Sequence, residues 1–169
     1  MTFDDFREKY HARLPNQCKI KNQDELLLMP EAEGKHSFYE QTIINVQQSH
    51  LPRDFNDRGN VHLWVIAKND VPFALELSDW ARKLESGRLK HTNLTGGAES
   101  HCGGELWFIE PNSIIVGGSS GRYGPKNEQE LQDAASAFAA CNYKVACMGF
   151  DEDTGQPLTV IVGEPEWLL

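Results

Sequence analysis

Apolar and polar residues alternate in three pairs of segments in the second half of the chain, and a short turn separates the members of each pair. The pairs are 61–68 with 71–77, 104–110 with 112–118, and 143–150 with 157–163. Alternation with a period of two, bounded by Gly, Pro, Asn and Asp, is typical of β-hairpins. The sequence therefore predicts three hairpins.

Residues 2–14 have the spacing of an amphipathic helix at the start of the chain. Phe3, Phe6 and Tyr10 fall on one helical face, and Thr2 followed by Asp5 forms a capping pair. Pro15-Asn16 is a helix stop, so we expect the helix to end there.

A second helix is predicted near 127–141. Asn127 caps it, Glu128 and Glu130 suit its positive end, and its apolar residues share one face: Leu131, Ala134, Ala135 and Phe138. Between the two helices the patterns are less decisive. Residues 25–29 fit a strand or a helix, we interpret 36–48 as helix, and the polar, turn-rich stretch 49–60 is a loop and a candidate mobile segment.

These elements together predict the fold class. The predicted order begins with helices and continues with paired strands, a helix and another strand pair. This order is typical of an α+β protein with a mainly antiparallel sheet. We expect one domain over 1–169, mostly helix and loop in 1–60 and sheet-rich in 61–169. A chain of this length buries about 70% of its unfolded surface, so it needs no metal or disulfide to fold.

Hydropathy excludes a membrane-spanning segment. No apolar run approaches the roughly 20 residues that a span needs. The first 14 residues are charged and amphipathic, unlike a secretory signal. We therefore expect a cytoplasmic protein without membrane contact.

Charge narrows the classes of partner. The chain has 16 basic and 25 acidic residues and a formal net charge of −9. Neutralisation of nucleic-acid phosphates needs the opposite balance, so nucleic acid is not an expected partner. The acidity fits either plain solubility or attraction to a basic protein partner. The oligomeric state is left open.

Cysteine and histidine spacing indicates no metal site and no cofactor. The four cysteines (18, 102, 141 and 147) form no CxxC pair, and the histidines form no HExxH motif. We expect four unpaired thiols.

Two glycine-rich loops, 92–104 and 117–125, flank the second predicted hairpin. Glycines gather where the backbone turns sharply or approaches a ligand closely. Neither loop matches a GxGxxG motif before a helix or a phosphate-binding GxxxxGK[ST] motif. They nevertheless mark the region where a site is most expected.

This region resembles bacterial proteins of unassigned activity and the central region of plant IQ-motif calmodulin-binding proteins. The shared pattern is a His followed by Ser or Thr, Gly-Gly, Ala-Gly-Glu before an apolar strand, and Ser-Gly-His-Tyr-x-Pro before a helix. The matching positions here are His91-Thr92, Gly96-Gly97, Gly104-Glu105, Ser120 to Tyr123, and Pro125. Arg122 stands in place of the family histidine and Gly103 in place of the alanine, and the IQ motif is absent. The resemblance marks a site and implies no particular reaction.

The residue types suggest roles within such a site. His91 exchanges protons near neutral pH, Glu105 can orient it or act as a base, and Tyr123 offers stacking and a hydroxyl, so we take these three as candidate catalytic residues. Arg122 suits a carboxylate or phosphate. The candidate ligand-binding residues are Thr92, Asn93, Gly96, Gly97, Ser119, Ser120, Gly121 and Arg122.

Each of these residues also has a structural reading, in which it is a hydrogen-bonding, turn or ion-pair residue. Two functions therefore remain open. The first is a small-molecule pocket, binding or catalytic, formed by the two glycine-rich loops for a phosphate- or carboxylate-bearing ligand. The second is an acidic binding module of the immunity or inhibitor type that occludes a basic protein.

Overall fold

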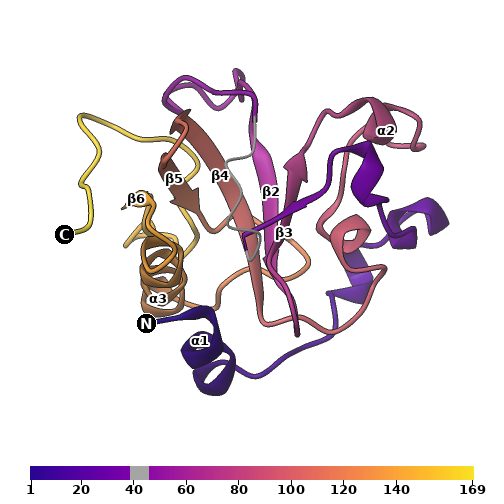
Figure 1. Cartoon of the computed structure of the whole chain (residues 1–169), viewed down its shortest axis with the longest axis horizontal. Coiled ribbons are helices and arrows are strands. Elements are labelled where there is room, and N and C mark those ends of the chain that lie inside the picture. The colour runs from indigo at the N-terminus through magenta and orange to yellow at the C-terminus, as the bar shows by residue number, and fades with distance from the viewer. Residues whose placement is uncertain (39–45) are drawn as a thin grey trace.

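The computed structural model describes residues 1–38 and 46–169, and in them it shows a six-stranded sheet (Figure 1). The sheet order is β1-β3-β2-β4-β5-β6, and neighbouring strands are antiparallel except for the parallel pair β5–β6. The expected α+β class with a mainly antiparallel sheet is confirmed. The strands are β1 (His36–Ser37), β2 (His62–Ile66), β3 (Pro72–Leu75), β4 (Cys102–Glu110), β5 (Ser113–Gly117) and β6 (Lys144–Cys147).

Two of the three predicted hairpins form. Strands β2 and β3 pair with Leu63 opposite Ala74, and β4 and β5 pair with Leu106 opposite Val116. Strand β2 also pairs with β4, which joins the two hairpins into one sheet and sets Trp64 opposite Gly104.

The third predicted hairpin, 143–150 with 157–163, is wrong. Helix α3 (Glu128–Ala139) carries the chain away from the end of β5, so that β6 enters the sheet parallel to β5. The stretch 157–163 forms no strand of the sheet. An isolated antiparallel bridge between Phe150 and Pro157 and the bond from the Leu158 N–H to the carbonyl of Gly149 join it to the end of 143–150. The Ile161 N–H also donates to the carbonyl of Pro52, and Arg53 donates to the carbonyl of Gly163.

Helix α3 confirms the predicted helix near 127–141. The side chain of Asn127 accepts from the N–H of Glu130, and the predicted apolar face is buried. Helix α1 (Phe3–Lys9) has the predicted capping box of Thr2 and Asp5 but ends well before Pro15. The reason is that Arg13 pairs in extended conformation with Ser100, which a helix through 14 would prevent.

The segments between α1 and β1 hold no α-helix and no strand of the sheet. Short 3₁₀ turns occupy η1 (Gln17–Lys19), η2 (Gln23–Leu26) and η3 (Glu31–Glu33). The helix interpretation of 36–48 is wrong at its start, because β1 pairs there with β3; residues 39–45 lie outside the described part. The expected loop at 49–60 holds no strand of the sheet and no helix.

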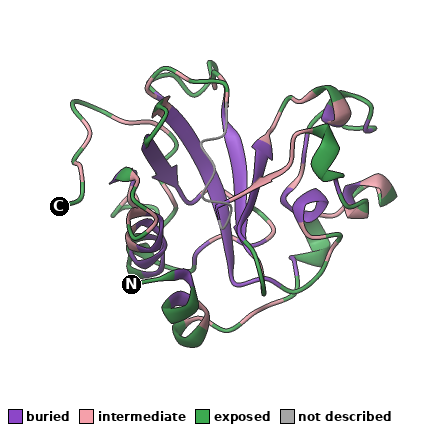
Figure 2. Cartoon of the chain, viewed as in Figure 1, coloured by how far each residue is buried: buried purple, intermediate pink, exposed green. Residues whose placement is uncertain are grey.

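The sheet is buried on both faces (Figure 2). Helices α1 and α3 cover one face, where Phe6, Trp64, Phe108 and Phe138 belong to the largest core cluster. The opposite face is covered by the 3₁₀ turns, α2 (Asp79–Arg82), η4 (His91–Leu94) and the C-terminal segment, and it carries the smaller cluster around Leu63, Val65 and Tyr123 and another around Trp107 and Ile115.

The outer edge of β6 is paired with the end of the chain. Trp167 forms a bridge with Ala146, and the N–H of Leu168 donates to the carbonyl of Val145. The ammonium of Lys144 lies 4.3 Å from the centre of the Trp167 ring. None of the described helices has the length and apolar character to cross a membrane.

Candidate functional site

The first glycine-rich loop begins with η4, whose four residues are all buried. The Nε2–H of His91 donates to the carbonyl oxygen of Gly104 on β4 at 2.7 Å. Because the carbonyl can only accept, this bond fixes the tautomer with the proton on Nε2. Burial, with Arg122, Lys90 and Arg58 nearby, lowers the pKa of His91 to about 4, so the ring is neutral at pH 7.

The side chain of Tyr123 comes from the second glycine-rich loop and is fully buried. Its hydroxyl donates to the carbonyl of Ala98 at 2.7 Å and lies 2.9 Å from Oγ1 of Thr95. Tyr123 and His91 both pack against Gly103: a Cβ at that position would lie 3.1 Å from Cβ of Tyr123 and 3.3 Å from Cδ2 of His91. The glycine of β4 therefore makes room for the two side chains.

Glu105 lies two residues further along β4 than Gly103, so it faces the same side of the sheet. Its carboxylate forms an ion pair with Arg58, and Nε of the same arginine lies 3.2 Å from Oε1 of Glu76. The three candidate catalytic residues thus share one face of the sheet. No hydrogen bond joins them to one another within the described residues, and each is bonded to other parts of the protein.

Three of the four ligand-binding candidates of the first loop contact the segment that precedes β1. The side-chain amide of Asn93 donates to the carbonyls of Asp24 and Leu27, at 3.0 and 2.9 Å. A Cβ at Gly97 would lie 3.0 Å from Cδ2 of Leu26. Thr92 is fully buried, and its hydroxyl has no partner in the described part of the chain. Asn93, Gly96 and Gly97 thus contact that segment of the chain.

The ligand-binding candidates of the second loop line a cavity of about 550 Å³. Ser119, Ser120, Gly121 and Arg122 form one wall; the others are Arg13, Asn16, Gly118, Gly124, Pro125, Gln156, Pro157 and Thr159. No residue from 92–104 is among the lining residues. The structure thus brings together four of the predicted residues with partners from both ends of the chain.

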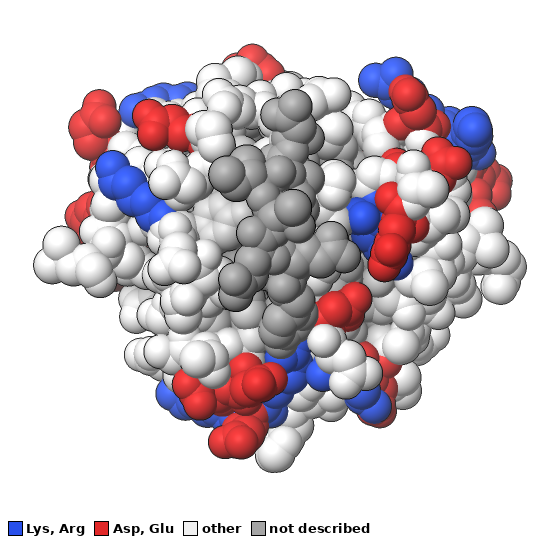
Figure 3. Space-filling view, in the orientation of Figure 1, with Lys and Arg blue, Asp and Glu red and all other residues white. Residues whose placement is uncertain are grey.

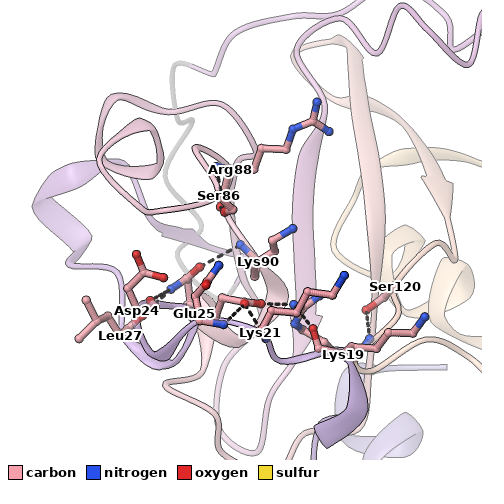
Figure 4. Close-up of polar contacts among 12 residues, drawn as sticks. Lys19, Lys21, Asp24, Glu25, Leu27, Ser86, Arg88, Lys90 and Ser120 are labelled. Carbon is pink, nitrogen blue, oxygen red and sulfur yellow. Dashed lines mark hydrogen bonds and ion pairs between the residues drawn. The ribbon is translucent and has the colours of Figure 1, made fainter.

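Arg122 connects this cavity to the N-terminal segment. Its guanidinium forms an ion pair with Glu25 and donates to the carbonyl of Lys19 at 2.9 Å, while its buried Nε has no partner among the described residues. Figure 4 shows Glu25 beside the backbone of Lys21, with Lys19 and Ser120 close by. Burial alone would raise the pKa of Glu25, but the N–H groups of Lys21 and Asn22 and the Arg122 charge lower it overall.

Arg13 supports the second loop from the other side, and the sequence contains no pattern that identifies it. Its Nη2 donates to the carbonyls of Tyr123 and Gly124 at 3.0 and 2.6 Å, and its Nη1 donates to the carbonyl of His101 and to Glu130 at 3.0 and 3.1 Å. Four bonds to this loop, to the residue that precedes β4 and to α3 hold both the arginine and the loop in place.

A larger cavity, about 870 Å³, lies where β2 begins and β3 ends. Its charged lining includes Arg58, Glu76, Arg82 and Arg88, and His62 also contributes to its wall. No sequence pattern predicts this cavity, because its residues come from separate turns and short elements that carry no common motif.

In the residues that the structure covers, no three His, Cys, Asp or Glu side chains are grouped to bind a metal ion. The four cysteines are free; Cys18 is exposed and Cys102 is buried. Comparison of the chain with family models, with curated proteins and with solved structures found no match. The resemblance of the glycine-rich region to IQ-motif proteins therefore stays a prediction.

Proposed function

We propose that the chain binds a small phosphate- or carboxylate-bearing molecule in the 550 Å³ cavity beside Ser119–Arg122. One observation carries the proposal. The chain has a net charge of −9, yet the described lining of this cavity has two arginines and no aspartate or glutamate. A cavity with this lining favours an anion over a cation or a neutral molecule.

The donors of the cavity support the same ligand. Both serines line it, and the Oγ of Ser120 already accepts from the N–H groups of Arg122 and Tyr123, which leaves its proton free to donate to a ligand. The N–H groups of Ser119, Ser120 and Gly121 donate to no acceptor in the part of the chain described. Successive free amides in a turn are a common anion-binding arrangement.

The arginines are held in place before any ligand arrives. Arg122 is fixed by Glu25 and Arg13 by Glu130, and neither carboxylate lines the cavity. A ligand therefore meets guanidinium groups whose position is already set, which reduces the conformational entropy lost on binding. Gly121 leaves open space on the same wall, since a Cβ there would meet only the Lys19 side chain, at 3.5 Å or more.

The alternative of an acidic module that covers a basic partner requires a continuous acidic surface. On the face in Figure 3, acidic side chains form separate groups interspersed with basic ones and, among the described residues, no continuous acidic patch. The cavity beside Ser119–Arg122 is the more specific feature, and we base the proposed function on it.

NMR of the backbone amides tests the proposal by monitoring the binding of four small molecules. Three are anions, inorganic phosphate, phenyl phosphate and benzoate, and the fourth is neutral benzamide. We expect the anions to bind and to shift the signals of Ser119, Ser120 and Gly121, and benzamide not to bind. The variant Gln156→Glu adds a negative charge to the lining with almost no change of shape. It should weaken anion binding by about fivefold or more.

The matched control is Gln132→Glu, an exposed change of the same kind on α3, outside the cavity. It should leave anion binding unchanged. Equal affinity for the anions and benzamide, or equal weakening by the two variants, would show that the cavity has no preference for anions and would overturn the proposal.

A further inference from the structure

The larger cavity, about 870 Å³, carries an inference that goes beyond the proposed function and does not depend on it. Its wall contains an excess of buried negative charge. Glu76 and Glu105 both pair with the single guanidinium of Arg58, and the side-chain exposures are 13%, 7% and 26%. Glu76 and Arg58 line the cavity, whereas Glu105 lies outside the lining and forms its ion pair with Arg58 there.

No other cation compensates these two carboxylates among the residues described, since neither has a second ion pair. His62 lines the same cavity, but its Nδ1 bonds to the carbonyl of Asn60 at 3.2 Å and burial keeps its ring neutral. Burying a carboxylate without a full counter-charge is costly, so this wall favours a cationic group on a ligand.

A second part of the same cavity favours an anionic group. Arg82 and Arg88 line it, and so does Asp79, whose pair with Arg82 at 3.6 Å is exposed and therefore weak; the guanidinium of Arg88 has no partner in the described segments. The N–H of Leu89 donates to the carbonyl of Glu76 at 2.9 Å, which keeps the Arg88 segment next to the acidic wall. Figure 4 shows the Arg88 side chain extending away from Asp24 and Glu25.

We propose that this cavity binds a zwitterionic molecule with a protonated amine and a carboxylate, that is, an α-amino acid or a dipeptide. The amine lies against Glu76, whose position Arg58 and Glu105 set, and the carboxylate lies between Arg82 and Arg88. Val61, Leu75 and Leu77 add apolar surface to the lining, which suits an aliphatic side chain. The volume is within the range of small-molecule sites, about 300–1,000 Å³.

Four probes test the two charges separately: glycyl-L-leucine, its N-acetyl derivative, its C-terminal amide, and L-leucine. Affinities are measured by titration, and the site is located by NMR from the amide signals of Gly59, Asn60 and Leu77. We expect glycyl-L-leucine to bind there, and each derivative that lacks one charge to bind about tenfold more weakly or less. If L-leucine binds as tightly as glycyl-L-leucine, the ligand is a free amino acid; if it binds more weakly, the ligand is a dipeptide.

Two variants assign the charges to their residues. Arg88→Gln breaks no described side-chain contact. It should weaken the binding of glycyl-L-leucine, so that the dipeptide no longer binds more tightly than its C-terminal amide. Glu76→Gln keeps a hydrogen-bond acceptor for Arg58. In this variant glycyl-L-leucine should no longer bind more tightly than its N-acetyl derivative. Lys83→Gln, an exposed loss of one positive charge outside the cavity, is the control and should change neither.

The proposal is overturned if glycyl-L-leucine does not bind at about 10 mM, or if both derivatives bind within about twofold of the parent. It is also overturned if the shifted amides lie elsewhere. Because these probes and variants concern a different cavity, their failure leaves the anion site beside Ser119–Arg122 unaffected, and the converse also holds.

Discussion

Nε2 of His91 lies 2.7 Å from the carbonyl oxygen of Gly104, so the candidate proton carrier is bonded to the backbone of the neighbouring strand. Only 6% of His91 is exposed. We therefore expect His91→Ala to lower the free energy of unfolding by about 1–3 kcal/mol, because it leaves a buried carbonyl without its donor. Urea denaturation measures this; His11→Ala, at an exposed position, is the control. Unchanged stability together with lost ligand binding would instead show a direct role in function.

Stability should fall as the pH is lowered from 7 to 5. His91 and His62 each have a pKa of about 4 in the folded protein against an ordinary value of 6.5, with burial as the main cause. Below pH 6.5 these two histidines are protonated in the unfolded chain but stay neutral in the folded chain. The free energy of unfolding that they contribute above pH 6.5 is therefore lost progressively as the pH falls towards 4.

Urea denaturation at several pH values measures this dependence. The variant His91→Ala should show a shallower fall between pH 7 and 5 than the parent protein. In this range Glu25 and Asp133 stay charged, since interactions in the fold lower the pKa of each. An identical slope for both proteins would contradict the prediction.

Gly104→Ala should destabilise the protein strongly. A Cβ at this position would overlap the carbonyl oxygen of Gly117 and lie 2.7 Å from Cζ2 of Trp64, and neither can move without disturbing the sheet. We expect a loss of about 2 kcal/mol or more in thermal or urea unfolding. Gly121→Ala, where the Cβ has room, is the matched control and should stay within about 0.5 kcal/mol. Similar losses in the free energy of unfolding for Gly104→Ala and Gly121→Ala would contradict the prediction.

Breaking the ion pair between Glu25 and Arg122 should lower the free energy of unfolding, whichever of the two residues is replaced. The two side chains are 2% and 11% exposed, and the loss of one leaves the other charged and buried. We expect Glu25→Gln or Arg122→Met to cost about 3–5 kcal/mol in urea unfolding. The double variant should recover part of this loss, because no unpaired charge remains. A strictly additive double variant would show that the pair is not coupled.

The four thiols should react in an order set by their burial. Cys18 is exposed, whereas burial raises the pKa of the Cys102 thiol far above its ordinary range. Mass spectrometry during alkylation of the native protein should therefore find Cys18 modified first and Cys102 last. Denatured, unreduced protein should show four free thiols; only two would indicate a disulfide.

Local patterns were sufficient for the parts of the fold that are local. The two antiparallel hairpins follow from period-two alternation across short turns, and α3 follows from a capped run of 3.6-residue spacing. The parallel pairing of β6 does not, because it depends on where α3 returns the chain. The stretch 157–163 has a strand-like composition, yet the side chain of Val162 is almost fully exposed.

The candidate site was predictable to a similar degree. Glycines singled out the second loop, and Ser119–Arg122 do line a cavity. The same reasoning expected close approach to a ligand at Gly103 and Gly104, but the structure fills that space with His91, Tyr123 and Trp64. Composition cannot separate a glycine that admits a ligand from one that admits a side chain. Arg13 and Gln156 join the cavity only through tertiary contacts.

The pairing of Trp167 and Leu168 with β6 has a consequence for how molecules of this protein meet in solution. A strand at the border of a sheet presents unpaired N–H and C=O groups, which template the addition of strands from other molecules. Here the chain's own last residues occupy part of that border, and Lys144 adds a positive charge beside them. At the opposite border β1 is only two residues long. The border at β6 thus offers few free N–H and C=O groups for intermolecular strand addition, which disfavours aggregation by that route.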